Sequence, residues 1–248
     1  MYNHNEKPTV YLLPFAGGGA SDMQRLRVEL QKSYPTYCLE LPGRGRRWRE
    51  PFIINIDDAI DDLYSQICID REAVIVGHSL GAYLGYKVAH QLSQSIRVQF
   101  FALSNISPSA ENSIAGNVSL SSSNEKILRL AGNHESLDKL RSHSMELYTL
   151  AMAVLRHDLV LSDSFLSCMD KPKLPCDIHL LYGLDECYSE EKLLQWNIFT
   201  DKKLKIHTVK GDHFFPQEHP KLTASIICSM LEEVEIYYRD SNQPVEPS

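Results

Sequence analysis

The chain has 248 residues, with 25 Lys and Arg against 32 Asp and Glu, which gives a formal net charge of −7. A mildly acidic chain with no basic recognition helix and no RNA motif is a poor candidate for a nucleic-acid-binding protein. The length suits one α/β domain with an insertion, and 43% hydrophobic residues are enough for a sizeable core.

Neither a membrane segment nor a metal site is expected. The first ten residues lack the apolar region of a signal peptide, and no apolar run approaches the roughly 18 residues of a membrane span. The six cysteines are scattered without a C-x-x-C pair, which indicates neither a disulfide framework nor a zinc site. We therefore expect a cytoplasmic enzyme with reduced thiols.

The first expected strand, at residues 10–14, runs into a loop of three consecutive glycines at 17–19. This loop has neither the Lys-Ser/Thr of a P-loop nor the G-x-G-x-x-G spacing of a dinucleotide site. Its backbone amides are therefore better suited to an oxyanion hole. A helix is expected next, at 22–31.

A second strand, at 37–41, is followed by four arginines in six residues: Arg44, Arg46, Arg47 and Arg49. So dense a cluster in an acidic protein is either a solvated loop or an anion-facing patch near the mouth of a site. A helix at 56–69 follows, with apolar residues on one side and aspartates on the other.

The central motif lies at 73–89. A β-branched apolar run at 73–76 predicts a buried strand, and the segment 82–89 predicts a helix. Between them stands G-x-S-x-G, with Ser79 at its centre. Strand, sharp turn and helix form the context of a nucleophile elbow, in which the flanking glycines leave room for a strained serine. A serine in an ordinary turn is the alternative.

From 107 to 173 the strand–helix alternation breaks. Ser122 and Glu125 form a capping box that opens a short helix ending near Gly132. The segment 144–155 is apolar on nearly every side, so a helix there must be covered all round or offer one face to an apolar ligand. We interpret 107–173 as a helical lid insertion; a plain helical extension of the core is the alternative.

The alternation then resumes. Strands are expected at 178–182 and 204–209, and helices at 190–196 and from 220 to about 237. The chain thus predicts an α/β-hydrolase fold, a mostly parallel central sheet flanked by helices. Residues 1–248 form a single domain in this prediction, and 240–248 form a disordered tail.

A serine nucleophile needs a base, and the base needs an orienting acid. In α/β hydrolases the acid and then the histidine follow the serine, each after a strand. Asp185 and His213 satisfy both order and position, and Glu186 is the competitor for the acid. Backbone amides of Ala16 and Leu80 are expected to hold the oxyanion. The residues alone predict a serine hydrolase with a lid.

Several motifs are more specific than G-x-S-x-G. They are LPFAGGGAS at 13–21, LPGRG at 41–45, GHSLGA at 77–82, LRHD at 155–158, GLDE at 183–186 with Trp196, and GDHFF at 211–215. Together they resemble the type II thioesterases, editing enzymes of polyketide and nonribosomal peptide assembly lines. By this resemblance Ser79, Asp185 and His213 match the triad, and Ala16 and Leu80 match the oxyanion positions.

The resemblance implies a substrate whose acyl group is bound as a thioester to the phosphopantetheine arm of an acyl or peptidyl carrier protein. No further cofactor is expected, and we expect a monomer. Medium-chain release, as in animal fatty-acid thioesterases, remains an alternative. So do a small-molecule carboxylesterase or lipase and, from another class, a non-catalytic receptor on a hydrolase fold.

Two further groups of residues are expected to recognise this substrate. At least two of the candidates Arg46, Arg47 and Arg49 would meet the carrier or its phosphate, whereas Arg44, inside the L-P-G-R-G turn, is expected to make structural hydrogen bonds. Met145, Met152 and Leu155, on the apolar lid helix, would line the path of the acyl chain.

Overall fold

The structure is a computed structural model, and it describes residues 7–68, 72–109, 118–131, 135–167 and 171–241. In this part of the chain six strands form one sheet in the order β2-β1-β3-β4-β5-β6. The strands are β1 (Thr9–Leu13), β2 (Thr36–Cys38), β3 (Glu72–His78), β4 (Arg97–Leu103), β5 (Ile178–Gly183) and β6 (Leu204–Val209). Every neighbouring pair is parallel, which confirms the expected α/β sheet and places all strand C-termini at one edge.

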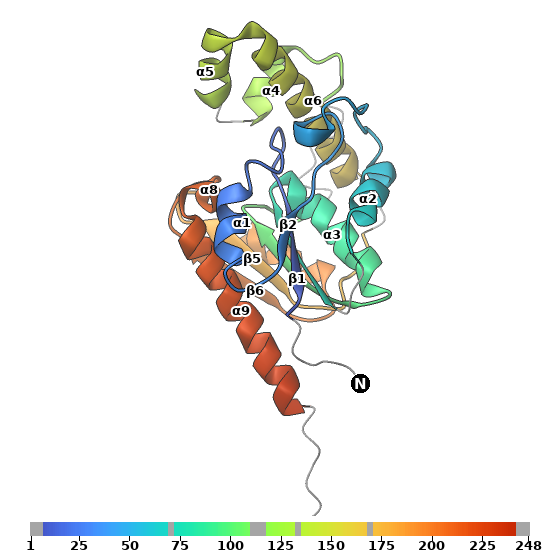
Figure 1. Cartoon of the computed structure of the whole chain (residues 1–248), viewed down its shortest axis with the longest axis vertical. Helices are drawn as coiled ribbons and strands as arrows, with labels where there is room; N and C mark the ends of the chain where they lie inside the picture. Colours follow the sequence, from blue (N-terminus) through green and yellow to red (C-terminus); the bar gives the residue numbers. More distant parts are fainter. Residues whose placement is uncertain (1–6, 69–71, 110–117, 132–134, 168–170, 242–248) are drawn as a thin grey trace, which may run out of the picture.

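Helices cover both faces of the sheet (Figure 1). One face carries α1 (Gln24–Leu30), α8 (Phe215–Glu218) and α9 (Pro220–Ser241). The other carries α2 (Ile56–Ser65), α3 (Leu80–Ser93), α7 (Glu190–Leu194) and the 3₁₀ helix η3 (Gln195–Phe199). Because successive strand residues point to opposite faces, Val74 joins the α1/α9 core and Ile75 the α3 core.

Between β4 and β5 the described residues form three helices, which lie beyond the C-terminal edge of the sheet (Figure 1). They are α4 (Asn124–Ala131), α5 (Glu135–His143) and α6 (Met145–Ser167). The insertion has a small core of its own, which includes Ile127, Tyr148 and Met152. The capping prediction was one residue off, because the hydroxyl of Ser123, not that of Ser122, accepts from Lys126 N–H.

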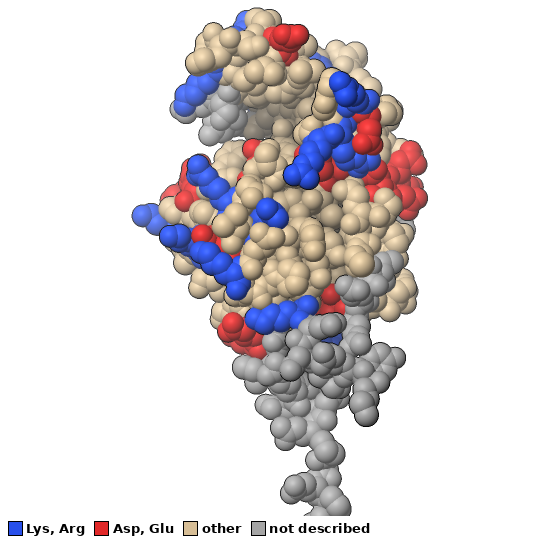
Figure 2. All heavy atoms as spheres, viewed as in Figure 1, with Lys and Arg blue, Asp and Glu red and all other residues tan. Residues whose placement is uncertain are grey.

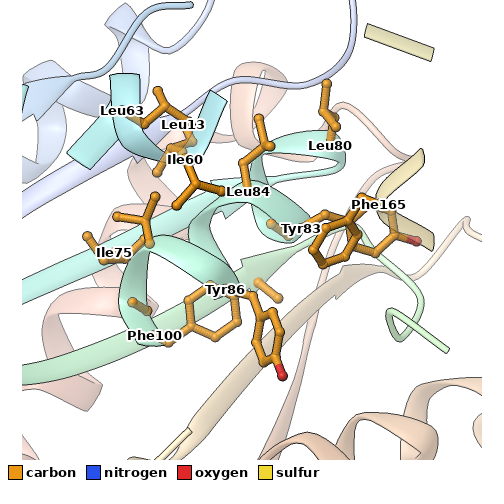
Figure 3. Packing of buried hydrophobic residues seen from close by; sticks show 14 of the residues in the cluster. Leu13, Ile60, Leu63, Ile75, Leu80, Tyr83, Leu84, Tyr86, Phe100 and Phe165 are labelled. Atoms are coloured by element: carbon orange, nitrogen blue, oxygen red, sulfur yellow. The ribbon is translucent and has the colours of Figure 1, made fainter. Parts of the chain in front are cut away.

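Helix α6 is longer than the expected 144–155 because its apolar pattern continues into the main core. Leu161, Phe165 and Leu166 are buried there, and the Phe165 ring stacks on Tyr83 of α3 at 5.1 Å (Figure 3). The C-terminal half of α6 is thus anchored in the body, and its N-terminal half extends into the insertion.

Helix α9 continues to Ser241 and so includes the first two residues of the tail expected at 240–248; residues 242–248 lie outside the described part. Parts of the expected lid, at 110–117, 132–134 and 168–170, also lie outside it. Among the described residues, no helix has both the length and the hydropathy needed to cross a membrane.

Candidate active site

Ser79 stands in a strained turn between β3 and α3. Its backbone has φ 54° and ψ −118°, in the left-handed range that few non-glycine residues adopt. A Cβ at Gly77 would overlap the Gly81 carbonyl, and one at Gly81 would overlap the Leu13 carbonyl. The two glycines of the motif are therefore required by close backbone approach, as a nucleophile elbow demands.

His213 follows β6 and turns its Nδ1 toward the end of β5. Nδ1 lies 3.1 Å from Glu186 Oε1 and 3.2 Å from the hydroxyl oxygen of Ser104. The Glu186 side chain is 5% exposed, and its other oxygen accepts from Gly183 N–H at 2.8 Å. Burial raises the pKa of Glu186, but hydrogen bonds from His213, Ser104 and Gly183 outweigh it and hold that pKa below its usual value. Glu186 is therefore an ionised partner for the imidazole.

The geometry contradicts the expected pairing of His213 with Asp185. Asp185 is exposed, and its contact with the β6 end is a backbone hydrogen bond to Gly211 O at 3.0 Å. The turn closed by Glu186 N–H and Gly183 O brings the next carboxylate, that of Glu186, inward. Glu186 was the competitor in the sequence analysis, and it is the acid that the fold presents to His213.

His78, next to Ser79, holds the His213 backbone. It is completely buried, and its Nε2 lies 2.8 Å from His213 O. Burial and the nearby charge of His213 place the pKa of His78 well below its usual value, so the ring is neutral. A neutral ring that donates from Nε2 to a carbonyl accepts at Nδ1, where Gln217 Nε2 lies at 3.3 Å. Gln217 was not singled out by the sequence analysis.

Among the described residues, one amide beside the glycine loop and one directly after the Ser79 elbow are left for a ligand. Gly17 N–H donates to Asp158 Oδ2 at 2.7 Å, Gly18 N–H to Phe15 O at 3.0 Å, and Gly19 N–H to Asp22 Oδ2 at 2.8 Å. Within the described residues, the amides of Ala16 and Leu80 donate to no protein group. Leu80 opens α3, so its amide also carries the positive end of the helix dipole. Both amides can therefore donate to an oxyanion.

A buried ion pair fixes this loop against α6. Arg44 Nη1 and Nη2 each lie 2.6 Å from one Asp158 oxygen, and the two side chains are 7% and 1% exposed. Arg44 Nη1 also donates to Gly18 O at 3.0 Å. Arg44 thus has the structural role expected of it, and Asp158, the last residue of the LRHD motif, is its unanticipated partner.

The other arginines differ in their surroundings. Arg47 forms bidentate ion pairs with Asp62, at 2.7 Å, and with Glu50, and these hydrogen bonds raise the pKa of Arg47. Arg46 and Arg49 are exposed, and Arg49 lies 4.5 Å from the Trp48 ring. Figure 2 shows basic side chains gathered over this loop with acidic ones beside them. Arg47 is therefore a structural residue and not the free cation that was expected.

The three expected lid residues do not lie together. Met152 and Leu155 are buried in the insertion core, and Leu155 packs against Gly17 of the glycine loop. Met145 is 58% exposed at the start of α6, on a stretch with exposed Leu147 and Leu150. Met145 thus lies apart from Met152 and Leu155.

Three other residues were missed by the sequence analysis, although all follow strands. Glu40 accepts hydrogen bonds from Ala20 N–H and Arg46 N–H, both at 3.0 Å, and so ties the loops after β1 and β2 together. Ser104 contacts His213, and the Asn105 side-chain amide donates to Ser79 O. Their position directly after β2 and β4 was the available signal, because parallel strands end at one edge.

Comparisons with known proteins cover nearly the whole chain. A family model described as "Thioesterase domain" matches residues 8–233. The probable anguibactin biosynthesis thioesterase AngT of Vibrio anguillarum is 25% identical over 90% of this chain and 91% of its own. The gramicidin S biosynthesis protein GrsT of Aneurinibacillus migulanus is 23% identical over 92% and 91%. The type II thioesterase BorB from the borrelidin biosynthetic cluster superposes with a TM-score of 0.74, at 24% identity over 92% and 94%, and shows the same fold.

Removing one partner of the buried ion pair should destabilise the protein. Asp158→Ala leaves the Arg44 guanidinium buried without its carboxylate and should lower the free energy of unfolding in urea by about 3–5 kcal/mol. Asp138→Ala removes an exposed carboxylate of α5 and should change the free energy of unfolding by less than about 0.5 kcal/mol. Equal effects of the two substitutions would contradict a structural role for the pair.

Proposed function

Since the chain belongs to the thioesterase family, we propose that it is an editing thioesterase of a polyketide or nonribosomal peptide assembly line. The enzyme is a hydrolase of thioesters. Its proposed substrates are acyl groups on the phosphopantetheine arm of acyl or peptidyl carrier proteins, which it would release when they are aberrant or stalled. The observation that carries this proposal is the strained Ser79 elbow, whose neighbour His78 contacts the backbone of His213, together with the His213–Glu186 pair.

The proposed mechanism is acyl transfer through Ser79. Glu186 accepts the Nδ1 proton of His213, which leaves Nε2 as the nitrogen that takes the Ser79 proton during attack on the thioester carbonyl. The amides of Ala16 and Leu80 would hold the oxyanion, at roughly 3 kcal/mol per donor. On collapse the carbon–sulfur bond breaks, and His213 Nε2 gives its proton to the sulfur, so that pantetheine leaves as the thiol and an acyl-enzyme remains. Neutral His213 then takes a proton from water, which attacks the acyl-enzyme, and returns that proton to Ser79 as the free acid leaves.

The surroundings of the site suggest where the acyl chain lies. Leu155 packs on Gly17, directly beside Ala16, and Met152 precedes it by one helical turn on α6. We propose these two side chains as the apolar lining nearest the reacting carbonyl. Met145 is not included, since it is exposed at the far end of the same helix.

Turnover of a loaded carrier tests the function. The purified protein should hydrolyse acyl-phosphopantetheinyl carrier protein with a higher kcat/KM than p-nitrophenyl esters, because remote contacts with the carrier contribute binding energy. Ser79→Ala should abolish hydrolysis while the fold persists, and a fluorophosphonate probe should label Ser79. Faster turnover of the simple esters would identify a carboxylesterase, and binding of free ligands without any turnover would identify a receptor.

The two adjacent carboxylates provide a test of the acid. Glu186→Gln preserves shape but replaces one of two accepting oxygens with an NH2 donor and removes the negative charge. With the remaining oxygen on Gly183 N–H, the NH2 faces Nδ1 and favours the wrong His213 tautomer, so kcat should fall by roughly 10²–10⁴-fold. Asp185→Asn, the matched control one residue away, should leave kcat nearly unchanged because Asp185 is exposed. Steady-state kinetics on one thioester measure both. The reverse ranking would return the role to Asp185.

The exposed arginines provide a test of the partner. Carrier proteins are typically acidic, and this chain is itself −7, so a local cationic patch is needed at close range. Arg46→Glu with Arg49→Glu should raise KM for the loaded carrier by about tenfold at low salt, since exposed ion pairs contribute up to about 1 kcal/mol each. Hydrolysis of a small uncharged thioester should not change.

Arg25→Glu with Lys221→Glu is the control for net charge, because it reverses the same number of charges at exposed positions of α1 and α9. It should leave KM for the carrier near its wild-type value. Equal losses on carrier and small thioester in the Arg46/Arg49 variant would show that the loop shapes the active site instead. An unchanged KM would show that the arginines are only solvated.

A further inference from the structure

A cavity lies at the N-terminal edge of the sheet, opposite to the edge that carries Ser79. It has a volume of about 560 Å³ and is ringed by the segments that enter β4, β5 and β6, together with Glu233 and Val234 of α9. In Figure 1, α9 extends past this N-terminal edge. Since β4 spans seven residues, the cavity is about 20 Å from the catalytic edge. The volume is within the range of small-molecule sites, and the proposed hydrolysis makes no use of it.

Two buried polar atoms in the lining have no protein partner. Gln99 is 7% and His179 1% exposed, and within the described residues neither Gln99 Oε1 nor His179 Nδ1 makes a hydrogen bond. The Gln99 amide is oriented by its nitrogen, which donates to Glu72 Oε1 at 2.9 Å. Its oxygen therefore needs a donor. Buried polar groups without partners are rare in proteins, and a pair of them in one cavity indicates a polar ligand group.

His179 is a neutral ring held in a fixed orientation. It stacks on Phe101 at 4.5 Å and on His207 at 5.7 Å. Burial, with the charges of Lys205 and His207, lowers the pKa of His179 to about 4. A neutral imidazole has one donor and one acceptor nitrogen. A hydroxyl group has one donor hydrogen and also accepts, so a single hydroxyl can donate to Gln99 Oε1 and accept from His179 when Nδ1 carries the proton. When Nδ1 is the acceptor, a second hydroxyl of the same ligand is needed to donate to it.

The rim of the cavity is cationic in an acidic protein. Arg97, Lys202, Lys203 and Lys205 line it, against the two carboxylates Asp177 and Glu233. Lys205 lies 3.0 Å from Asp177, whereas Lys202 and Lys203 are exposed and form no ion pair among the described residues. Two lysines in the same lining are thus available to an anion.

We propose that this cavity binds a small hydroxylated anion. Its hydroxyl group would contact Gln99 and His179, and its phosphate or carboxylate would contact Lys202 and Lys203. The site is separate from the hydrolytic centre, so its occupancy can be measured without turnover.

Binding can be followed at His179 itself. In protein labelled with ¹⁵N-histidine, the imidazole signal of His179 can be assigned by its loss in His179→Phe. This signal should shift saturably when D-glucose 6-phosphate or D-gluconate is added. The compound that binds more tightly shows whether the site prefers a phosphate or a carboxylate. Inorganic phosphate lacks the hydroxyl groups and should bind about tenfold more weakly, the equivalent of one or two hydrogen bonds. D-glucose lacks the anion and should give no saturable shift.

Variants separate the floor from the rim. Gln99→Leu should weaken binding of the hydroxylated anion about tenfold, and should bring it close to that of inorganic phosphate. Lys203→Glu, a substitution at an exposed position, should weaken the binding of both the hydroxylated anion and inorganic phosphate. Lys221→Glu, at the exposed start of α9, is the matched control and should leave the binding of both anions unchanged.

The proposal is overturned if neither hydroxylated anion shifts the His179 signal. It is also overturned if inorganic phosphate binds as tightly as they do, or if Lys221→Glu weakens binding as much as Lys203→Glu. Hydrolysis of thioesters by the Gln99→Leu protein should match the wild type, which shows that the variant is folded. Loss of the proposed thioesterase activity would not affect the binding result.

Discussion

The ion pair between Arg44 and Asp158 determines how the candidate active site is assembled. Isolated burial of either charge would cost several kcal/mol, and the pair offsets that cost through two 2.6 Å hydrogen bonds and two further bonds to the glycine loop. Those four bonds join three segments that are far apart in the sequence. They place the loop that carries Ala16 against α6, and so couple the proposed oxyanion site to the insertion.

The rest of the site follows from the parallel sheet. Because all strands end at one edge, six successive strand ends deliver one part each: the glycine loop, the Glu40–Arg44 turn, Ser79, Ser104, Glu186 and His213. The stacking of Phe165 on Tyr83 then anchors α6 in the core directly behind the elbow helix. The insertion is thus held at two levels, by apolar packing in the body and by the ion pair at the loop.

The sequence predicted what depends on local pattern and chain order. Apolar runs located the strands, G-x-S-x-G located the elbow, and position after a strand located His213. It favoured Asp185 over Glu186, whereas the structure pairs His213 with Glu186, because the choice depends on how the turn after β5 packs against Gly211. It could not show that Arg47 is paired, since its partner Asp62 lies on another helix. Nor could it foresee Met145 as exposed, because periodicity does not say where a long helix leaves the body.

A glutamate as the acid makes particular demands on its surroundings. Glu has one more rotatable bond than Asp, so holding its carboxylate in one place costs more side-chain entropy. The structure supplies a fixed partner for each oxygen: Gly183 N–H for Oε2, and His213 for Oε1, with Ser104 beside both groups. Ser104 itself has φ 52°, an uncommon backbone conformation directly after β4. The strain at Ser104 is therefore best understood as a consequence of directing its hydroxyl at the Glu186–His213 pair, just as the strain at Ser79 directs the nucleophile.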